Sequence, residues 1–495
     1  MTSQQAAAVK AAGRIQVLSA GAGSGKTRTL VAKVANDQDR GVSPGRQVVV
    51  TFTNAAANEV RSRIEGSGGE IPNFVGTLHA FALRMIGPTI GTPRMIGDKE
   101  FDKLIEDVFE SASIKGITRR KAREFASGDG TGLVGKNRSA RAAIVGAMGK
   151  ANLIHPDMIL GIFKRTIHSI DFPKGLSVYV DEFQDTASID AAIYRVLVED
   201  FEANLFVVGD PRQAIFAFRG ATFVEFLKLW ERADWRGELT TNFRSTETIV
   251  TEANRIASLM NIPGEIDQIM HSPKDKGPEI RRLKFTNCEE EADAIATTLR
   301  SIVNSPEGPS ALEDFAILAR YNASVAMIGD VLRSHGIEVN SSLDRADAIA
   351  FLDEDEVVKK LLGYRGEIPT DAQGWHDLLV KEFDAPLKTR DLLFPIVLDV
   401  TEAEALPFAL KEGILRPKAS AVTVSTIHAA KGLEWPEVWL VGADEKSFDP
   451  SDSEDVRLAY VAATRPETRL TISFATSRIS FRREVDLEPS PILFP

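Results

Sequence analysis

The sequence predicts an α/β protein with two parallel sheets in tandem. Short runs that are almost continuously apolar alternate with helix-like segments, as expected of strands that helices bury on both faces. These runs fall into two sets along the chain, which predicts two separate sheets. A glycine-rich turn follows the first run and opens a helix-like segment, the strand, turn and helix order of a doubly wound fold.

The predicted strands of the first set lie at 14–20, 47–53, 176–182 and 204–210, and a further strand ends near Thr77. Those of the second set lie at 279–285, 315–320, 421–427, 437–443 and 469–475. Two gaps between consecutive strands are too long for ordinary connections. We therefore expect a largely helical, basic insertion at 87–170 and a second insertion at roughly 341–420. The remaining segments are 1–86 and 171–270 for the first domain, and 271–340 and 421–495 for the second.

The composition is that of a large globular protein. The chain has 495 residues, of which 43% are hydrophobic and 26% charged, so it is too long for one small binding module and too apolar for intrinsic disorder. Because the sequence contains no apolar stretch of membrane-spanning length and no signal-peptide pattern at its start, we expect a cytoplasmic protein with no membrane association. Cys288 is the single cysteine, which excludes an intrachain disulfide and a thiolate-rich metal site.

The charge is unevenly distributed along the chain. The formal net charge is −11, yet residues 1–170 hold 24 Lys and Arg against 14 Asp and Glu, a balance of +10. The remaining residues hold 35 basic and 56 acidic side chains, a balance of −21. A basic amino-terminal third is suited to facing phosphates. On charge alone, a solvated surface without a partner is equally compatible.

A phosphate-binding loop is predicted after the first strand. The chain passes from Ala20 through a glycine-rich turn into a helix-like segment that begins with Lys26 and Thr27. The backbone N–H groups of such a turn can surround phosphates, the lysine can reach the β- and γ-phosphates, and the threonine can bind Mg²⁺. The residues of the turn are Gly21, Ala22, Gly23, Ser24 and Gly25.

Two carboxylates follow the predicted strand at 176–182. Asp181 is suited to binding Mg²⁺, and Glu182 is suited to polarising an attacking water molecule. An acidic pair at a strand end is by itself more often a solvated strand end. Together with the phosphate-binding loop, however, the pair predicts hydrolysis of a nucleoside triphosphate.

Further segments carry a resemblance to a known family. They are 5–9 (QAAAV), 51–54 (TFTN), 76–81 (GTLHAF), 181–186 (DEFQDT), 209–213 (GDPRQ), 216–221 (FAFRGA), 242–246 (NFRST), 430–435 (AKGLEW) and 458–465 (LAYVAATR). In these segments and in their order, the sequence resembles superfamily 1A DNA helicases of the UvrD/Rep/PcrA type. It departs from the family pattern at Ala20, where glycine is usual, at Ala55, where lysine is usual, and at Phe218, where tryptophan is common.

The resemblance implies two RecA-like motor domains, each interrupted by a mainly helical insertion, with ATP and Mg²⁺ bound between the motor domains. It assigns roles in hydrolysis to Lys26, Glu182, Gln213, Arg244 and Arg465. The side chains implied in nucleotide binding outside the phosphate-binding loop are Gln5, Arg28, Phe243 and Glu434. Phe243 and Arg28 are expected to stack on opposite faces of the adenine ring, by contacts of roughly 1 kcal/mol each.

The resemblance also implies a path for single-stranded DNA. The aromatic side chains expected to stack on bases are Phe52, Phe216 and Phe218. The other DNA contacts that it implies are Thr53, Asn54, His79, Arg219, Arg320, Asn322 and His428. The basic run 118–123 of the first insertion is compatible either with a contact to duplex DNA or with a solvated helix face.

Taken together, the motifs predict an ATP-dependent translocase on single-stranded DNA, and the family resemblance implies that it unwinds duplex DNA from 3′ to 5′. Its expected substrates are single-stranded DNA and junctions between single- and double-stranded DNA. The alternative is a translocase that displaces bound proteins with little unwinding. Since Arg244 and Lys431 are 187 residues apart, a shorter interval than is common in the family, we also expect a reduced second insertion.

Overall fold

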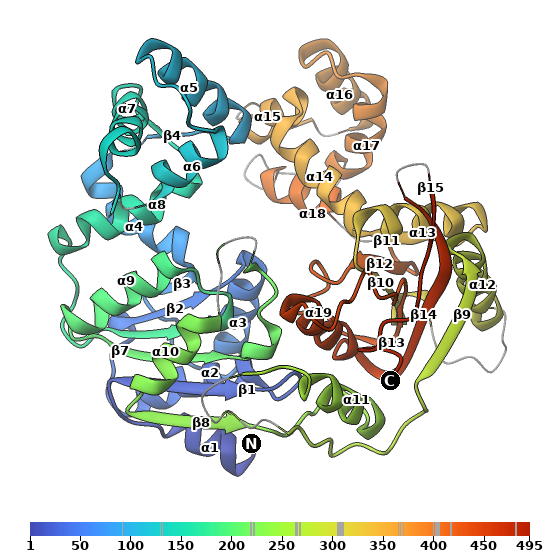
Figure 1. The fold of residues 1–495 in the computed structure, drawn as a ribbon. Coiled ribbons are helices and arrows are strands. Elements are labelled where there is room, and N and C mark those ends of the chain that lie inside the picture. The colour runs from blue at the N-terminus through green and yellow to red at the C-terminus, as the bar shows by residue number, and fades with distance from the viewer. Residues whose placement is uncertain are drawn as a thin grey trace. The chain divides into compact units, whose positions relative to one another are not determined.

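The computed structural model describes residues 1–495 except 92, 129, 131, 218–219, 221–222, 263–265, 267–268, 304–310, 365, 367, 370, 399, 401–405, 416–417 and 481–482. The described residues form two compact units (Figure 1). The first consists of Met1–Arg244 and Met260–Pro273, and the second of Ser245–Leu259 and Lys274–Pro495.

The first unit is built on a six-stranded sheet with the order β3-β2-β6-β7-β1-β8. All of its neighbouring strands are parallel. Successive residues of a strand point to opposite faces, so Val48 and Val50 enter one hydrophobic core while Val49 enters the other. The strands are β1 (Ile15–Ala20), β2 (Gln47–Thr51), β3 (Phe74–Thr77), β6 (Ser177–Val180), β7 (Asn204–Gly209) and β8 (Trp235–Leu239).

Helices cover both faces of this sheet. On one face lie α1 (Ser3–Val9), α2 (Lys26–Asp39) and α3 (Asn54–Gly66). On the other lie α4 (Leu78–Ile90), α8 (Pro156–Thr166), α9 (Ser188–Glu199) and α10 (Phe223–Arg232). This arrangement explains why the strands are nearly continuous apolar runs, because neither face of the sheet meets water.

The first insertion has a hydrophobic core of its own, which includes Phe101, Ile105, Ile144 and Met148. Its helices are α5 (Asp98–Ser111), α6 (Arg119–Ser127) and α7 (Gly135–Lys150), and β4 (Arg94–Met95) pairs with β5 (Leu153–Ile154).

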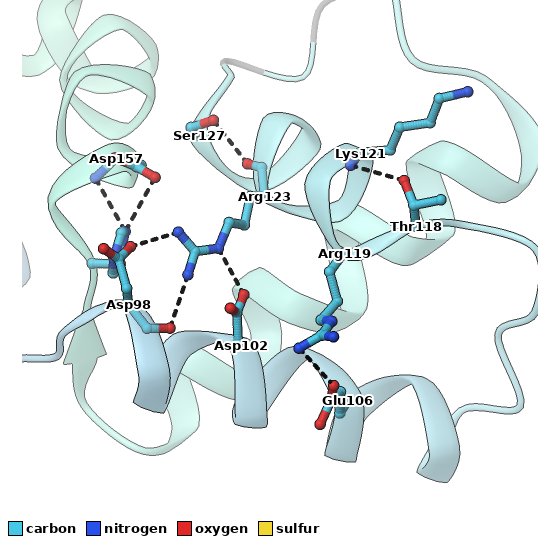
Figure 2. Close-up of polar contacts among 10 residues, drawn as sticks. Asp98, Asp102, Glu106, Thr118, Arg119, Lys121, Arg123, Ser127 and Asp157 are labelled. Carbon is cyan, nitrogen blue, oxygen red and sulfur yellow. Dashed lines mark hydrogen bonds and ion pairs between the residues drawn. The ribbon is translucent and has the colours of Figure 1, made fainter. Parts of the chain in front are cut away.

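The basic run 118–123 caps and begins α6, and two of its four basic side chains face α5 (Figure 2). Arg119 pairs with Glu106 at 3.1 Å, and Arg123 pairs with Asp102 at 2.7 Å and with Asp98 at 2.5 Å. In Figure 2 the Lys121 side chain extends away from these pairs. The contacts favour helix packing over duplex binding as the role of both arginines.

The second unit contains a seven-stranded sheet with the order β11-β12-β10-β13-β14-β15, in which β9 also pairs with β14. All pairs are parallel except the pair of β14 with β15. The strands are β9 (Arg281–Asn287), β10 (Phe315–Ala319), β11 (Val339–Ser341), β12 (Val422–Thr426), β13 (Trp435–Leu440), β14 (Pro466–Ser480) and β15 (Arg483–Asp486). The prediction of an α/β protein with two parallel sheets is thus confirmed.

The helices of the second motor domain are α11 (Glu247–Ala257), α12 (Cys288–Val303), α13 (Asn322–Ser334) and α19 (Ser453–Ala463). Helix α11 packs against α19, whereas the sequence division placed it in the first domain. Its apolar face, which includes Ile249 and Ala253, predicts burial but does not indicate which domain supplies the partner.

The second insertion is helical and has a separate core around Trp375 and Leu379. Its helices are α14 (Ser342–Glu354), α15 (Glu356–Leu362), α16 (Ala372–Asp377), α17 (Leu387–Val397) and α18 (Leu406–Leu415). None of the helices in the described parts of the chain combines the length and the apolar character that a membrane crossing requires.

The packing of α8 against the end of α6 predicts a sharp difference between two glycines. A Cβ atom on Gly161 would lie 2.3 Å from the Ser127 carbonyl oxygen, which is backbone and cannot rotate away. We expect Gly161→Ala to destabilise the first unit by about 1–3 kcal/mol through overpacking. A Cβ atom on Gly146 in α7 meets nothing within 4 Å, so Gly146→Ala should stabilise by roughly 0.5–1 kcal/mol. Urea unfolding of the two variants beside the parent checks this, and equal midpoints would contradict it.

Candidate functional site

The phosphate-binding loop lies between β1 and α2. The Ser24 hydroxyl donates to the Gly21 carbonyl at 2.7 Å, which closes the turn. Lys26 begins the helix, and its Nζ atom folds back to within 3.3 Å of the Ala20 carbonyl oxygen. The ammonium group therefore lies over the loop, where it can neutralise phosphate charge beside the helix N-terminus.

Gln5 fixes the loop from α1. It is 4% exposed, and its side-chain Nε2 donates to the Ser24 carbonyl at 3.0 Å. The same side chain completes a capping box with Thr2 at the start of α1. This hydrogen bond joins α1 to the loop, and the role of Gln5 in nucleotide binding stays a prediction.

The segment that follows β8 fixes the loop from its other side. Asn242 is 1% exposed, and its Nδ2 donates to the Ala22 carbonyl at 2.9 Å. Its Oδ1 accepts from the Arg244 backbone N–H, and the Phe243 N–H donates to the Gly23 carbonyl. A Cβ atom on Gly23, whose φ is +65°, would lie 2.7 Å from Arg244 Cβ, so this approach requires glycine.

Thr27 and Asp181 lie side by side, as expected for a shared Mg²⁺ site. The Thr27 hydroxyl donates to Asp181 Oδ2 at 2.8 Å. Burial, and then the neighbouring charge of Glu182, raise the pKa of Asp181 from 3.8 to about 7, against the opposing effects of Thr27 and Lys26. Both side chains offer the hard oxygen ligands that Mg²⁺ prefers, so the residues fit this ion.

Glu182 occupies a strained backbone position directly beside this pair. Its φ of 53° lies in the left-handed region, which is uncommon for a residue other than glycine. Its backbone N–H donates to Asp181 Oδ1 at 3.0 Å. The predicted Mg²⁺ ligand Asp181 and the predicted catalytic residue Glu182 thus lie together directly after β6.

Gln213 lies in the turn after β7 and is 4% exposed. Its Nε2 donates to Asp210 Oδ2 at 2.7 Å. Since β1, β6 and β7 are parallel strands of one sheet, this turn shares a sheet edge with Lys26 and Glu182. The structure therefore brings three of the predicted hydrolysis residues to the same edge.

An aromatic pair with one exposed and one half-buried ring lies at that edge as well. Phe52, which follows β2 and is 37% exposed, stacks on Phe216 with a centroid distance of 5.2 Å and an angle of 17° between the rings. Thr53 accepts from the Ala56 N–H and caps α3, while Asn54 and His79 are exposed at the starts of α3 and α4. Phe218 and Arg219 lie outside the described residues.

Two further predicted nucleotide contacts of the first unit are exposed. Phe243 is 44% exposed, and Arg28 is exposed in the first turn of α2. Their exposure leaves both flat groups accessible to a stacking ligand.

In the second unit the predicted residues separate into two groups. Arg320, Asn322 and His428 follow the carboxyl ends of the parallel strands β10 and β12. Arg465 and Glu434 instead precede β14 and β13, at the opposite edge.

The Arg465 side chain is 1% exposed and forms several hydrogen bonds within the second unit. Its guanidinium donates to the Val461 and Leu433 carbonyls at 3.0 and 3.1 Å. It also donates to the Thr464 hydroxyl at 3.0 Å. Its predicted contact with the γ-phosphate stays a prediction.

Sequence reasoning missed two residues of this site. It quoted Asn242 and Gln184 within motifs but assigned neither a contact. Asn242 holds the phosphate-binding loop, and Gln184 is fully buried between the turns that follow β6 and β7. The sequence signal that could have identified both residues was their position inside motif segments.

Two family descriptions match most of the chain. "UvrD/REP helicase N-terminal domain" matches residues 1–115 and 175–234, and "UvrD-like helicase C-terminal domain" matches 238–366 and 380–477. The chain belongs to the UvrD/Rep helicase family. Its resemblance to superfamily 1A helicases is confirmed, and the chain is an enzyme of an ATP-dependent DNA helicase family.

Known relatives of this UvrD/Rep helicase match over its whole length. The ATP-dependent DNA helicase PcrA of Staphylococcus epidermidis strain ATCC 35984 is 25% identical over 648 residues, which cover 100% of this chain and 86% of the relative. PcrA of Staphylococcus aureus strain Mu50 is 23% identical over 650 residues, with the same coverage. A crystal structure of the C-terminal domain of a possible DNA helicase from Lactobacillus plantarum WCFS1 is 14% identical, covers 51% of this chain and 91% of its own, and has a TM-score of 0.27.

The matched regions of this UvrD/Rep helicase include the site described above. Residues 1–115 contain Lys26 and Phe52, and residues 175–234 contain Asp181, Glu182 and Gln213. The gap inside each description, 116–174 in the first and 367–379 in the second, lies in or beside a helical insertion.

The raised pKa of Asp181 predicts how stability depends on pH without nucleotide or Mg²⁺. A carboxyl group with a higher pKa in the folded than in the unfolded state stabilises the fold below its unfolded pKa, and this contribution is lost as pH rises from about 4 to about 7. The free energy of unfolding of the parent should therefore fall between pH 5 and 7.5. Asp181→Asn should reduce this fall by on the order of 1–3 kcal/mol.

Urea unfolding in EDTA at the two pH values measures this difference. Asp39→Asn, at an exposed position at the end of α2, is the control and should leave the pH dependence unchanged. If the free energy of unfolding changes equally with pH in Asp181→Asn and in the parent, the raised pKa of Asp181 is contradicted.

Proposed function

We propose that this UvrD/Rep helicase is an ATP-dependent translocase on single-stranded DNA that unwinds duplex DNA from 3′ to 5′. One observation carries the proposal. The Asp181 and Glu182 carboxylates and the stacked pair of Phe52 and Phe216 follow parallel strands of the same sheet, at the same edge. A nucleotide site and a surface for stacking bases thus share one rigid element.

The nucleotide chemistry follows from the residues at the loop. Thr27 and Asp181 would hold Mg²⁺, which when bound neutralises phosphate charge and orients the phosphates. Lys26 would contact the β- and γ-phosphates, and Glu182 would accept a proton from the attacking water. Arg244 and Arg465 would add positive charge at the γ-phosphate, as the superfamily 1A motifs imply.

Coupling to DNA would run through the segment that follows β7. Gln213 and Phe216 are three residues apart in this segment. A shift of Gln213 on hydrolysis would therefore displace a base-stacking side chain without a long mechanical path. The aromatic contact suits a motor because every base has a π-face, so stacking does not depend on sequence.

The relatives support DNA as the substrate. They are ATP-dependent DNA helicases, and the match extends over all of this chain. The alignment with the S. epidermidis protein spans 648 positions against the 495 residues of this chain, a difference of 153. The reduced second insertion remains an expectation from the spacing of Arg244 and Lys431. The polarity rests on the superfamily 1A pattern of the motifs.

Tailed duplexes test the function directly. With ATP and Mg²⁺ we expect strand displacement from a duplex with a 3′ single-stranded tail and little from one with a 5′ tail. Glu182→Gln should abolish displacement while still binding ATP, because it keeps the shape of the side chain and removes the base. Displacement from the 5′ tail alone would refute the polarity. Removal of streptavidin from biotinylated single strands without duplex unwinding would favour the alternative translocase.

The aromatic pair predicts a variant that separates movement from hydrolysis. Phe216→Ala removes one partner of the stack and a contact worth about 1–3 kcal/mol per base. We expect it to slow translocation on labelled oligonucleotides at least fivefold while DNA-free ATP hydrolysis changes less than twofold. Stopped-flow translocation and steady-state ATPase measure the two rates. An equal loss in both would assign Phe216 to the structural core.

A further inference from the structure

Gln184 lies between the hydrolysis residues and the turn after β7. Its side chain is fully buried, and it sits in a short 3₁₀ turn, Phe183–Asp185, directly after the Asp181 and Glu182 pair. Its Oε1 accepts from the Asp210 backbone N–H at 2.9 Å, and its Nε2 donates to Glu182 Oε2 at 2.5 Å. One amide group therefore contacts both turns.

The chemistry of the neighbours fixes the orientation of this amide. The Asp210 backbone N–H is a donor, so the amide oxygen must face it, and the amide NH₂ must then face Glu182. The fit is close, because a Cβ atom on Gly209 would lie 2.5 Å from Gln184 Oε1. Reversing the amide would place two donors together at Asp210 and two acceptors together at Glu182.

Glu182 needs such a partner. Its left-handed backbone, with a φ of 53°, costs free energy and persists where the surroundings hold it. A carboxylate that must accept a proton from one water molecule also has to keep one direction. The hydrogen bond from Gln184 supplies that direction from a side chain that is itself fully buried.

The other end of the amide leads toward the predicted DNA contact. Asp210 Oδ1 accepts from the Arg212 N–H at 3.0 Å, and Asp210 Oδ2 accepts from Gln213 Nε2 at 2.7 Å. The Asp210 carboxylate thus organises the turn that contains Gln213 and leads to Phe216. A continuous set of hydrogen bonds joins Glu182, Gln184, Asp210 and Gln213.

We propose that Gln184 is a positioning residue for ATP hydrolysis, which orients the Glu182 carboxylate and joins it to the turn that carries Gln213. The proposal rests on the proposed function, because it takes Glu182 as the group that activates water. Its consequence is that movement of the 210–216 segment on binding DNA changes the orientation of Glu182 and thereby the hydrolysis rate.

Two substitutions separate the hydrogen bonds of Gln184. Gln184→Met keeps the length of the side chain and removes both bonds. Gln184→Glu keeps an acceptor for the Asp210 N–H but places a carboxylate against Glu182. We expect each to lower kcat about tenfold to hundredfold, as misplacement of a reacting group does, and to change the KM for ATP less than threefold. The stimulation of ATPase by single-stranded DNA should fall at least fivefold in Gln184→Met.

Gln47→Met is the matched control. Gln47 is also fully buried in the first unit, where it donates to the Val34 carbonyl and the Tyr179 hydroxyl and accepts from Gln38. It lies at the start of β2, whereas the Glu182 turn follows the end of the neighbouring strand β6. Gln47→Met should lower the unfolding midpoint about as much as Gln184→Met and leave kcat within threefold of the parent.

A double-mutant cycle tests whether Gln184 acts through Glu182. If it does, adding Gln184→Met to Glu182→Gln should lower the single-turnover rate less than twofold, because the group that Gln184 orients has already been lost. Multiplication of the two effects would overturn the proposal. So would parent-like kcat in Gln184→Glu, which retains the bond to Asp210, or an equal loss of kcat in Gln47→Met.

These outcomes are distinguishable from failure of the proposed function. Hydrolysis by the parent protein, with and without single-stranded DNA, is measured first, using a fluorescent non-hydrolysable ATP analogue to confirm nucleotide binding in every variant. Absence of hydrolysis in the parent would refute the proposed function itself. Hydrolysis in the parent that Gln184→Met and Gln184→Glu leave unchanged would refute the role of Gln184 alone.

Discussion

The common direction of the strands in the first sheet determines where its chemistry lies. Helices bury both faces of the sheet, so charged groups can be accommodated without deep burial mainly where strands end. Four parallel strands end at Ala20, Thr51, Val180 and Gly209 along one edge. The phosphate-binding loop, Phe52, the two carboxylates and the Gln213 turn each follow one of these strand ends, and Phe216 lies in the same segment as Gln213. Their proximity is a consequence of sheet topology rather than of nearness in sequence.

The edge is also where the fold holds unfavourable charge and strain. Burial and Glu182 together raise the pKa of Asp181 to about 7, which means that its ionised form is disfavoured in the protein alone. Glu182 adds a left-handed backbone position at the next residue. The hydroxyl of Thr27 and the ammonium of Lys26 oppose the rise in the pKa of Asp181. A divalent cation beside Asp181 would further favour the ionised carboxylate.

Local pattern determined which parts of this structure could be predicted from sequence. The strand predicted at 204–210 is observed as β7, Asn204–Gly209. It could be predicted because a strand buried on both faces is a continuous run of apolar residues. Strand β8, Trp235–Leu239, was not predicted, since this edge strand contains two charged residues and a glycine. Strand β11 has three residues, Val339–Ser341, and is too short to give a pattern.

Some residues of the candidate site could likewise be predicted from the sequence, and others could not. The loop and the acidic pair were predictable because their chemistry is written in consecutive residues. The contacts of Asn242 and Gln184 were not, since their partners lie 220 and 26 residues away. In the basic run 118–123, the sequence shows the charges but not their partners. The charges alone are compatible with a nucleic-acid surface, whereas the structure places α5 carboxylates opposite Arg119 and Arg123.

The paired arginines bear on how an acidic chain could hold DNA during movement. The net charge is −11 although residues 1–170 carry +10, and the ion pairs of Arg119 and Arg123 leave these two side chains little attraction for phosphates. Stacking of a base on an exposed ring such as Phe52 would supply about 1–3 kcal/mol, which corresponds to roughly a fivefold to 150-fold change in occupancy. A contact of that size is strong enough to define a position on the strand and weak enough to be broken at each step. A stepping enzyme needs both properties, and under the proposed function the pair of Phe52 and Phe216 would provide them beside the Gln213 turn.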